Sequence, residues 1–127
     1  MAIPSGSGTE VLKRTTINNQ STDATAFRWD GTMATVGTET YTVPANHIIT
    51  VLSIIMCEQT NTAESVHMYM YDGANNHQLL EGQALSAYST FIWNDRFVLT
   101  GGDKLIVDLA DAGSVDFVLS YIDQDWT

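Results

Sequence analysis

Strict alternation of apolar and polar side chains is the feature that most limits what this chain can fold into. From Val66 to Tyr71, one Val and two Met residues alternate with one His and two Tyr residues. The same two-residue period recurs in Lys104–Leu109 and in Val115–Ile122. Successive side chains of a β-strand point to opposite faces, whereas a helical stripe repeats about every 3.6 residues. No segment carries a convincing helical stripe, so the sequence predicts strands and no helix longer than about three turns.

Turn residues divide the chain into short candidate strands. Asp30-Gly31 supplies the positive φ angles of a tight turn, so we expect a hairpin between Thr25–Trp29 and Thr32–Val36. About seven to nine such strands at near-regular spacing predict an all-β fold, either an antiparallel β-sandwich or a jelly roll. The other candidate strands are Val11–Asn19, Glu39–Val43, His47–Glu58, Gln78–Leu80 and Ser89–Leu99, the last of which is one bent strand or two.

The segment His47–Glu58 is the most apolar part of the chain. Strict alternation gives it an apolar set on each face, so this strand is central in its sheet, or one of its faces meets a partner. Its single cysteine, Cys57, cannot form an intramolecular disulfide and is expected to act as a small buried apolar residue. The first apolar set is Ile48, Leu52, Ile54 and Met56, and the second is Ile49, Val51, Ile55 and Cys57.

Chain length and the first ten residues define the domain organisation. A chain of 127 residues has the usual size of one domain, and we assign residues 11–127 to a single β-sandwich domain. Residues 1–10 are rich in Gly, Ser and Pro, which predicts a flexible N-terminal arm. We expect Ile3 to anchor this arm on a neighbouring subunit, with Pro4 stiffening the chain beside it. A frayed end without a role is the alternative.

The charge balance argues against two classes of partner. The 5 Lys and Arg residues against 15 Asp and Glu residues give a formal net charge of −10. Such a field repels phosphate backbones and anionic lipids, so we expect neither nucleic acid nor a membrane as partner. No apolar run reaches the ~18 residues of a membrane span, and none forms a signal peptide. We therefore expect the protein to be made in the cytoplasm.

Sequence motifs for catalysis or cofactor binding are missing. His47, His67 and His77 form no metal-ligand pattern, and the acidic turns lack the spacing of a calcium loop. No nucleophile elbow or phosphate-binding loop occurs. We therefore expect no cofactor, no metal and no enzymatic activity. A pair of glycosidase carboxylates stays open at this point, because spatial separation defines it.

Six aromatic residues allow two interpretations. Packing in the core or against another subunit is the favoured one, and a sugar-stacking platform is the alternative. Among the six, Tyr69 and Tyr71 share a strand face with His67, which fits a surface that meets a partner. The six residues are Trp29, Trp93, Trp126, Tyr69, Tyr71 and Tyr88.

Two aliphatic residues near the end of the chain predict self-association. The apolar residues at odd positions of Val115–Ile122 face inward, which leaves Val118 and Ile122 on the face that a monomer would expose. Exposed aliphatic surface of this kind indicates a subunit contact. We therefore predict a homo-oligomer, specifically a trimer, with Val118, Ile122, Tyr69 and Tyr71 in its protein interfaces.

Two turn motifs carry a resemblance to a known family. The first is Tyr41–Asn46, read as YTVPAN, and the second is Leu99–Val107, read as LTGGDKLIV. With the alternating strand Val66–Met70 between them, they resemble the small β-sandwich virion proteins of tailed bacteriophages. In that family a TVPA turn precedes a strand, and an L-x-x-G-D-x-L-x-V turn links two late strands. The similarity extends over residues 41–121, about two-thirds of the chain.

The resemblance implies a non-catalytic component of the virion, made in the host cytoplasm. A capsid decoration, or cement, protein is the most typical function, with the major capsid protein or other virion subunits as partners. Members commonly form trimers that clamp capsid subunits through an N-terminal arm, and the family has no catalytic residues to transfer. The alternatives are a tail, neck or fibre component and a carbohydrate- or receptor-binding module at a virion tip.

Overall fold

The computed structural model describes residues 9–126, and every regular element in this range is a β-strand. The predicted all-β fold is confirmed. Among residues 9–126 there is no helix that could cross a membrane. β1 starts inside the range 1–10 that the sequence assigns to the arm, and residues 1–8 lie outside the described residues. The strands are β1 (Thr9–Gln20), β2 (Thr25–Ala26), β3 (His47–Glu58), β4 (Glu64–Tyr71), β5 (Asn76–Leu85), β6 (Thr90–Trp93), β7 (Phe97–Thr100), β8 (Lys104–Leu109) and β9 (Val115–Asp125).

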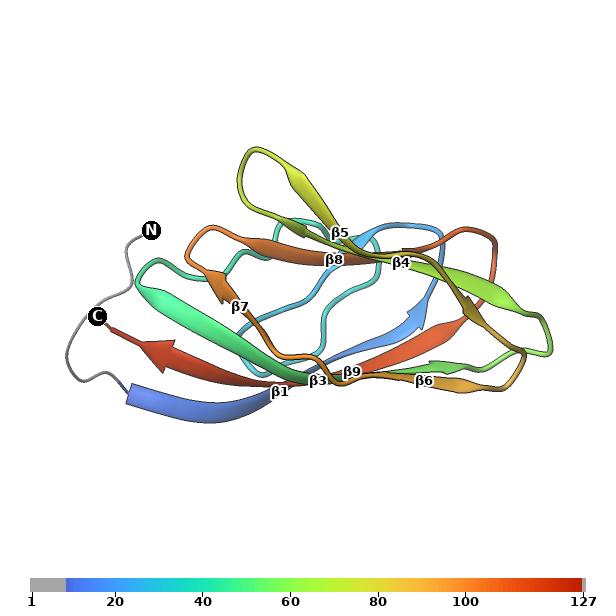
Figure 1. Cartoon of the computed structure of the whole chain (residues 1–127), viewed down its shortest axis with the longest axis horizontal. Coiled ribbons are helices and arrows are strands. Elements are labelled where there is room, and N and C mark those ends of the chain that lie inside the picture. The colour runs from blue at the N-terminus through green and yellow to red at the C-terminus, as the bar shows by residue number, and fades with distance from the viewer. Residues whose placement is uncertain (1–8, 127) are drawn as a thin grey trace.

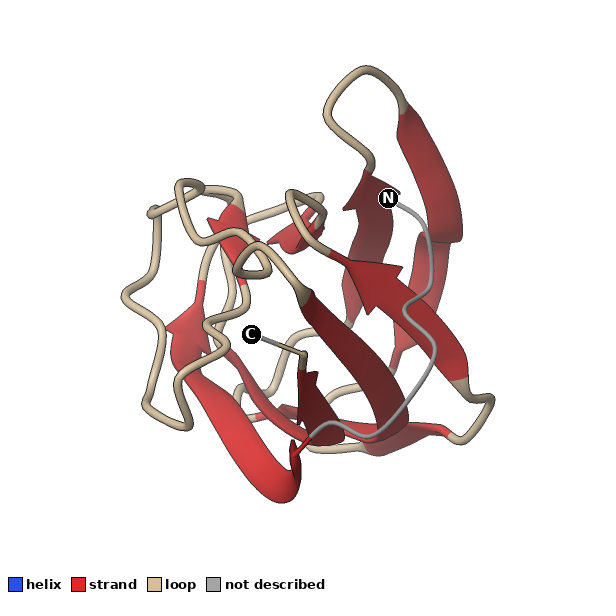
Figure 2. Cartoon of the chain, turned by 90° about the vertical axis from the view of Figure 1, so that its left-hand side faces the viewer, coloured by secondary structure: helices blue, strands red, loops and turns tan. Residues whose placement is uncertain are grey.

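The strands form two antiparallel sheets that lie face to face (Figure 1). Sheet A has the order β1-β9-β3-β6, and β7 also pairs with β3. Sheet B has the order β2-β8-β4-β5. Sheet A lies along the lower side of Figure 1 and sheet B along the upper side, and Figure 2 shows the same layers from the left-hand end. The architecture is therefore a β-sandwich, as predicted.

The core fills the space between the inner faces of the two sheets. Phe117 and Tyr121 of β9 are fully buried, as the alternation in this strand predicts. Phe27, which follows β2, packs edge-on against Phe117 with the ring centroids 5.9 Å apart. Trp29 packs against Tyr121 in the same manner at 5.0 Å. Such aromatic pairs add about 0.5–1.5 kcal/mol each beyond burial, so they hold the segment after β2 against the core.

A β-bulge in β3 changes which residues of this strand face inward. The pairing of β3 with β9 shifts register between Val51 and Ser53. An extra residue at a bulge moves the later side chains to the opposite face from the one that strict alternation assigns. The two alternating sets predicted for His47–Glu58 are therefore wrong, because each set changes face at the bulge. The fully buried residues of β3 are Ile49, Val51, Ile54 and Met56.

The hairpin predicted at Asp30-Gly31 and the strand predicted at Glu39–Val43 do not occur in the described structure. The Asp30 carboxylate instead accepts hydrogen bonds from the backbone N–H and the hydroxyl of Thr32, which closes a local turn. Gly31 has a φ of +82° and donates its N–H to the Tyr121 hydroxyl, 3.1 Å away. These contacts attach the turn to the core, so the residues after the turn do not pair with the segment before it as the second strand of a hairpin would.

Two other predictions concern strand length. β5 spans Asn76–Leu85, which is longer than the predicted Gln78–Leu80, and its register against β4 shifts twice. Gly82 accommodates this irregularity with a φ of +74°. Of the two options for Ser89–Leu99, the structure has two strands, because β6 pairs with one half of β3 and β7 with the other. Their connection, residues 94–96, passes the bulge.

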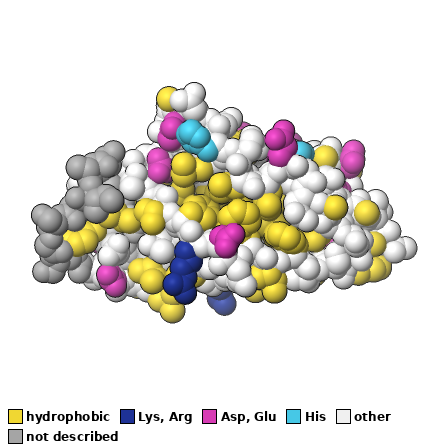
Figure 3. Space-filling model, in the orientation of Figure 1, with side chains coloured by type: hydrophobic (Ala, Val, Ile, Leu, Met, Phe, Trp, Pro, Cys, Tyr) yellow, Lys and Arg dark blue, Asp and Glu magenta, His cyan; other side chains and the backbone are white. Residues whose placement is uncertain are grey.

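The edges of the two sheets leave some hydrophobic side chains partly uncovered. Phe91, Trp93 and Phe97 of β6 and β7 pack against the core without full burial. The rings of Trp93 and Phe97 meet edge-on with centroids 6.1 Å apart. Figure 3 shows hydrophobic side chains in a band between the two layers of the sandwich. β5 and β6 end their sheets, so neither has a further strand beside it among the described residues.

Candidate interaction surface

The outer face of sheet A exposes aliphatic side chains from several strands. Figure 3, which has the orientation of Figure 1, shows hydrophobic side chains along the lower margin, where sheet A lies. Side chains on one face of a sheet come from alternate residues of each strand. The register assigns four exposed hydrophobic residues of β1, β3, β6 and β7 to this face, whereas the exposed Val11 of β1 lies on the opposite face. Their exposed fractions are 70% for Leu12, 40% for Ile55, 54% for Ile92 and 51% for Val98.

The first row of side chains crosses four strands, and three of its four members are aliphatic. Leu12 of β1 pairs with Ile122 of β9, and Ile122 pairs with Thr50 of β3. Thr50 in turn pairs with Val98 of β7. Directly opposite side chains on one face have Cβ atoms about 4.5–5.5 Å apart. The first row is therefore a continuous strip across the sheet.

The second row runs parallel to the first. Thr16 of β1 pairs with Val118 of β9, and Val118 pairs with Ile55 of β3. Ile55 pairs with Ile92 of β6. Three of these four side chains are aliphatic, and each is partly or fully exposed. The second row is a second strip of apolar surface on the same face.

A polar row separates the two aliphatic rows. Arg14 of β1 pairs with Ser120 of β9, which pairs with Ser53 of β3. The exposed Arg14 side chain has no ion pair or hydrogen bond with any residue between 9 and 126. Glu10 and Asp116, towards the two ends of the face, each accept a hydrogen bond from a neighbouring residue. The face therefore carries one unpaired cation between two apolar strips.

The structure places the predicted residues Val118 and Ile122 within these rows, one in each. Sequence reasoning missed Leu12, Ile92 and Val98, because their strands reach this face only through pairing with distant parts of the chain. The available signal was the apolar character of both faces of β3, which predicted a central strand or a partner contact. β3 is indeed central in sheet A, and its outer face contributes to both rows.

Tyr69 and Tyr71 lie on the outer face of sheet B, on the opposite side of the sandwich from the aliphatic rows. Both are partly buried. The Lys104 Nζ atom lies 5.5 Å from the centroid of the Tyr71 ring, within the range of a cation–π contact. Burial raises the pKa of Tyr69, and the carboxylates of Glu39 and Asp108 raise it further. The two tyrosines therefore belong to a second surface, which is aromatic and charged.

The other predicted contact residues, Ile3 and Pro4, lie outside the described residues. The described chain begins at Thr9, which pairs with Asp125 at the edge strand of sheet A. The described part of the chain therefore begins beside the end of β9.

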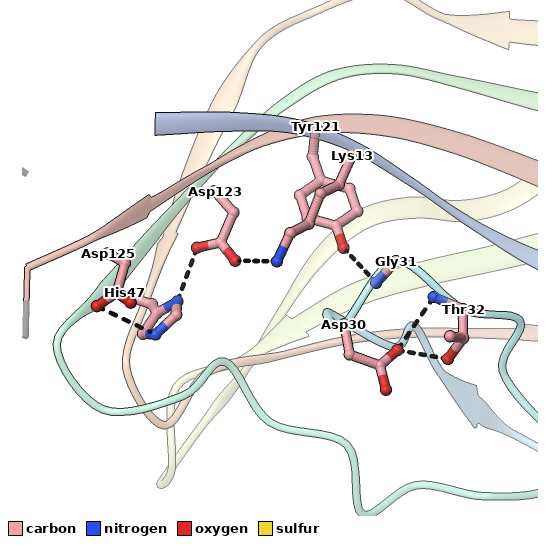
Figure 4. Close-up of polar contacts among 8 residues, drawn as sticks. All are labelled: Lys13, Asp30, Gly31, Thr32, His47, Tyr121, Asp123 and Asp125. Atoms are coloured by element: carbon pink, nitrogen blue, oxygen red, sulfur yellow. Dashed lines mark hydrogen bonds and ion pairs between the residues drawn. The ribbon is translucent and has the colours of Figure 1, made fainter. Parts of the chain in front are cut away.

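A buried carboxylate joins the ends of three strands in sheet A (Figure 4). Asp123 of β9 is 3% exposed and accepts a hydrogen bond from Lys13 Nζ of β1 at 2.9 Å. Its other oxygen lies 2.7 Å from His47 Nδ1 of β3. His47 Nε2 lies 3.5 Å from the carboxylate of Asp125. Because a buried charge is costly unless it is paired, this cluster links β1, β3 and β9 to one another.

Tyr121 extends this polar region into the core. Burial is the main cause that raises the pKa of Tyr121 to about 12. The N–H of Gly31 bonds the hydroxyl oxygen and acts in the opposite direction, while the carboxylates of Asp123 and Asp30 raise the pKa further. Tyr121 therefore stays neutral across the physiological pH range and serves as a hydrogen-bonded core residue.

The histidines have partners that give them structural roles. His67 Nδ1 accepts the N–H of Gly82 at 3.1 Å, and His77 Nε2 lies 2.8 Å from the Asp72 carboxylate. The N–H of Asn75 and the His77 side chain hold the pKa of Asp72 well below its usual value. Between residues 9 and 126, no hydroxyl or thiol bonds a histidine, and no cluster of three or more metal-ligating side chains occurs.

The aromatic residues do not line up on one face. Trp29 is buried in the core at 3% exposure, and Trp93 is packed against Phe97. Tyr88 is 68% exposed but lies in the turn between β5 and β6. A sugar-stacking platform needs exposed rings in a row, so the structure favours packing and subunit contact for these residues.

The two turn motifs behind the family resemblance contact each other. Val43 donates its N–H to the carbonyl of Asp103 at 2.9 Å, and Gly102 donates to the carbonyl of Val43 at 2.9 Å. A Cβ atom at Gly101 would lie 3.1 Å from the carbonyl oxygen of Pro44. Glycine therefore allows the close approach of the two turns. Motifs far apart in the sequence thus form one structural unit at the start of β3.

Comparisons with known proteins concern the fold. No protein-family model matches the sequence, and no curated protein matches it. A chain of the disulfide-linked pili that form Bacillus endospore appendages is similar at 15% identity, with a TM-score of 0.54 and coverage of 100% of this chain and 97% of that chain. The Drosophila NLP core, known for pentamer formation and histone binding, is similar at 12% identity, with a TM-score of 0.53 and coverage of 92% and 99%.

A viral chain shares the same sandwich. A chain of infectious bursal disease virus, strain Gx, is similar at 10% identity and a TM-score of 0.53 over 94% of this chain and 34% of that chain. This likeness concerns the β-sandwich fold, which the resemblance also implies.

Proposed function

We propose that this protein is a non-catalytic structural component of a virion, and specifically a capsid decoration protein that binds and stabilises the shell. The observation that carries the proposal is the pair of aliphatic rows on the outer face of sheet A. Contiguous exposed apolar surface on a folded domain marks a site of protein association. A protein built for association with other subunits is what this surface supports best.

Two further features support a structural role. The hydrogen-bonded histidines and carboxylates tie strands and turns together, as the cluster around Asp123 shows. The formal net charge of −10 keeps a domain with an apolar face soluble before it assembles. The turn motifs at Tyr41–Asn46 and Leu99–Val107 add the resemblance to tailed-phage virion proteins.

In this proposal the aliphatic rows of sheet A join copies of the protein to one another, and the contacts to the shell come from the N-terminal arm and from sheet B. Ile3 would supply an apolar anchor and Pro4 would stiffen the chain beside it. Tyr69 and Tyr71 would add an aromatic contact on the outer face of sheet B, where Lys104 and Asp108 supply charges for a complementary partner. The partner is the major capsid protein or another virion subunit.

The test uses purified protein and particles that lack it. Saturable binding to the shell, with an increased temperature of particle disruption, is the expected result. Imaging of the occupied particles shows whether the protein lies on the capsid, as proposed, or on a tail, neck or fibre. Density on a tail or fibre alone, or no binding to any part of the particle, would refute the decoration role.

A variant of the arm sharpens this test. Replacing Ile3 and Pro4 by Gly keeps the length of the arm and should weaken shell binding at least tenfold, or by about 1.4 kcal/mol. The control replaces Ser5 and Ser7 by Gly and should bind as the unmodified protein does. Equal binding by all three proteins would show that the side chains of Ile3 and Pro4 contribute nothing to attachment.

A further inference from the structure

The two aliphatic rows need an occupant, and the distribution of charge restricts what it can be. The outer face of sheet A carries three charged residues, Glu10, Arg14 and Asp116, in a chain that has 20. Most of the negative charge therefore lies on other surfaces. Two copies of a strongly acidic protein can therefore approach one another through this face with little repulsion.

The pattern of the rows is also self-complementary. Each row runs across the strands and has three aliphatic side chains and one threonine, Thr50 in the first row and Thr16 in the second. A two-fold axis parallel to the strands, between β9 and β3, would place each row on the same row of a second copy. β1 of one copy would then lie over β6 and β7 of the other, and β9 over β3.

We propose that the outer face of sheet A binds the same face of a second copy of this chain through this two-fold contact. The inference rests on the proposed assembly role and names the partner of its apolar surface. The contact is a dimer, so it differs from the trimer that the sequence analysis predicts.

The position of Arg14 favours a two-fold axis parallel to the strands over one perpendicular to them. A two-fold axis across the strands, along the polar row, would bring Arg14 of both copies together, and like charges repel. With the axis parallel to the strands, Arg14 lies over the connection 94–96 of the second copy. This connection contains Asp95 and Arg96, so its net charge is zero and a carboxylate is within the same loop.

The size of the face is sufficient for a stable dimer. β9 contributes residues 116–124 to this face, which is about 30 Å of strand at ~3.4 Å per residue, and four strand positions at ~4.8 Å span about 19 Å. Each copy thus offers roughly 570 Å², and a dimer would bury at least about 1,100 Å², which exceeds the ~1,000 Å² expected of a specific interface. Side chains protrude from the plane of the sheet, so the surface of the face is larger than this planar area.

The first test changes the most exposed residue at each side of the face. Leu12→Glu lies in the first row on β1, and Ile92→Glu lies in the second row on β6; both side chains are more than half exposed. The control Ala74→Glu introduces the same charge at an exposed position in the turn between β4 and β5. Circular dichroism should show the same strand content in all proteins.

Light scattering at tens of micromolar protein measures the mass of each variant in solution. The unmodified protein and the control should have twice the chain mass of 13.9 kDa, and each row variant should have the mass of a single chain. A monomeric or trimeric unmodified protein would overturn the inference, and so would dimers that persist in both row variants.

A crosslink tests whether the outer faces of sheet A meet in the dimer. Ser120→Cys in a Cys57→Ser background places one thiol in the polar row, where β9 of one copy lies over β3 of the other. A short bis-maleimide should join two chains through Ser120→Cys, whereas Ala74→Cys in the same background should stay uncrosslinked. Absence of the Ser120→Cys product in a dimeric protein would refute this packing. Shell binding is measured separately, so a dimer that binds no shell would refute only the decoration role.

Discussion

The buried Asp123 carboxylate should be one of the most sensitive positions for stability. The substitution Asp123→Ala removes the acceptor for Lys13 Nζ at 2.9 Å and for His47 Nδ1 at 2.7 Å. Hydrogen bonds to charged groups contribute about 1.5–3 kcal/mol each. The two side chains left behind are 29% and 18% exposed, so water can partly replace the lost partner. We therefore expect a loss of about 2–4 kcal/mol in the free energy of unfolding.

The assay is equilibrium unfolding in urea, which yields the midpoint and the slope. Loss of a contact without a change in compactness lowers the midpoint and leaves the slope unchanged. Asp123→Asn keeps the shape and one hydrogen-bond acceptor, so its loss should be smaller than that of Asp123→Ala. Asp125→Ala is the matched control, because its carboxylate is 43% exposed and lies 3.5 Å from His47; it should cost less than about 1 kcal/mol.

Equal losses for Asp123→Ala and Asp125→Ala would refute the reasoning, since it assigns the stabilisation to the buried carboxylate. A double-mutant cycle with Lys13→Met adds a direct measure. The coupling energy between residues 13 and 123 should be about 1 kcal/mol or more. A coupling near zero would mean that the Lys13 contact is made in the structure without contributing to stability.

Three further predictions concern packing, pH and metals. Gly113→Ala should lower the free energy of unfolding by about 2 kcal/mol or more, because the new Cβ would overlap Oε2 of the buried Glu64. The other oxygen of Glu64 accepts the N–H groups of Ser65 and Asp111, so the side chain cannot move away without losing these bonds. Urea unfolding that is unchanged by the substitution would contradict this prediction. The folded-state pKa of Tyr121, raised to about 12, favours the neutral form. The contribution of neutral Tyr121 to the free energy of unfolding is fully present below pH ~10 and should fall by about 2 kcal/mol as the pH rises to 12. In the Tyr121→Phe variant this loss of stability at high pH should be absent. A chelator should leave the melting temperature within about a degree, and a larger decrease would reveal a metal site.

The alternating strands were predictable from sequence because their faces depend on local order alone. In β9 the period of two is uninterrupted, and Phe117, Leu119 and Tyr121 are all fully buried as predicted. In β3 the same rule fails after Val51, because a bulge is a property of the pairing with β9. Nothing in the residues 47–58 themselves marks the extra residue.

The segment between β2 and β3 shows a second limit of local reasoning. Asp30-Gly31 is a strong hairpin signal, yet Gly31 bonds Tyr121, which lies 90 residues further along the chain. The buried rings of Phe27 and Trp29 add tertiary contacts that a hairpin would lose. A favourable local turn was therefore overridden by packing against β9.

The candidate interaction surface was predictable only in part. Val118 and Ile122 follow from alternation within one strand, whereas Leu12 and Ile92 join them through pairings across more than 30 residues of chain. Tyr69 and Tyr71 were grouped with the same set of contacts, but they belong to the other sheet. Which faces coincide depends on strand order, and strand order is a non-local property.

The pairing of Thr9 with Asp125 has a mechanical consequence. Thr9 and Asp125 lie at the same end of two antiparallel neighbours, so a pull on both residues would load the hydrogen bonds of β1 and β9 one pair at a time. This is the geometry of a zipper, which opens under less force than strands sheared along their length. The contact of Lys13 with Asp123 lies a few pairs inside and would meet the load early. With the proposed attachment through the arm, the domain therefore withstands tension best when a sheet face, and not the end of β9, carries the opposing load.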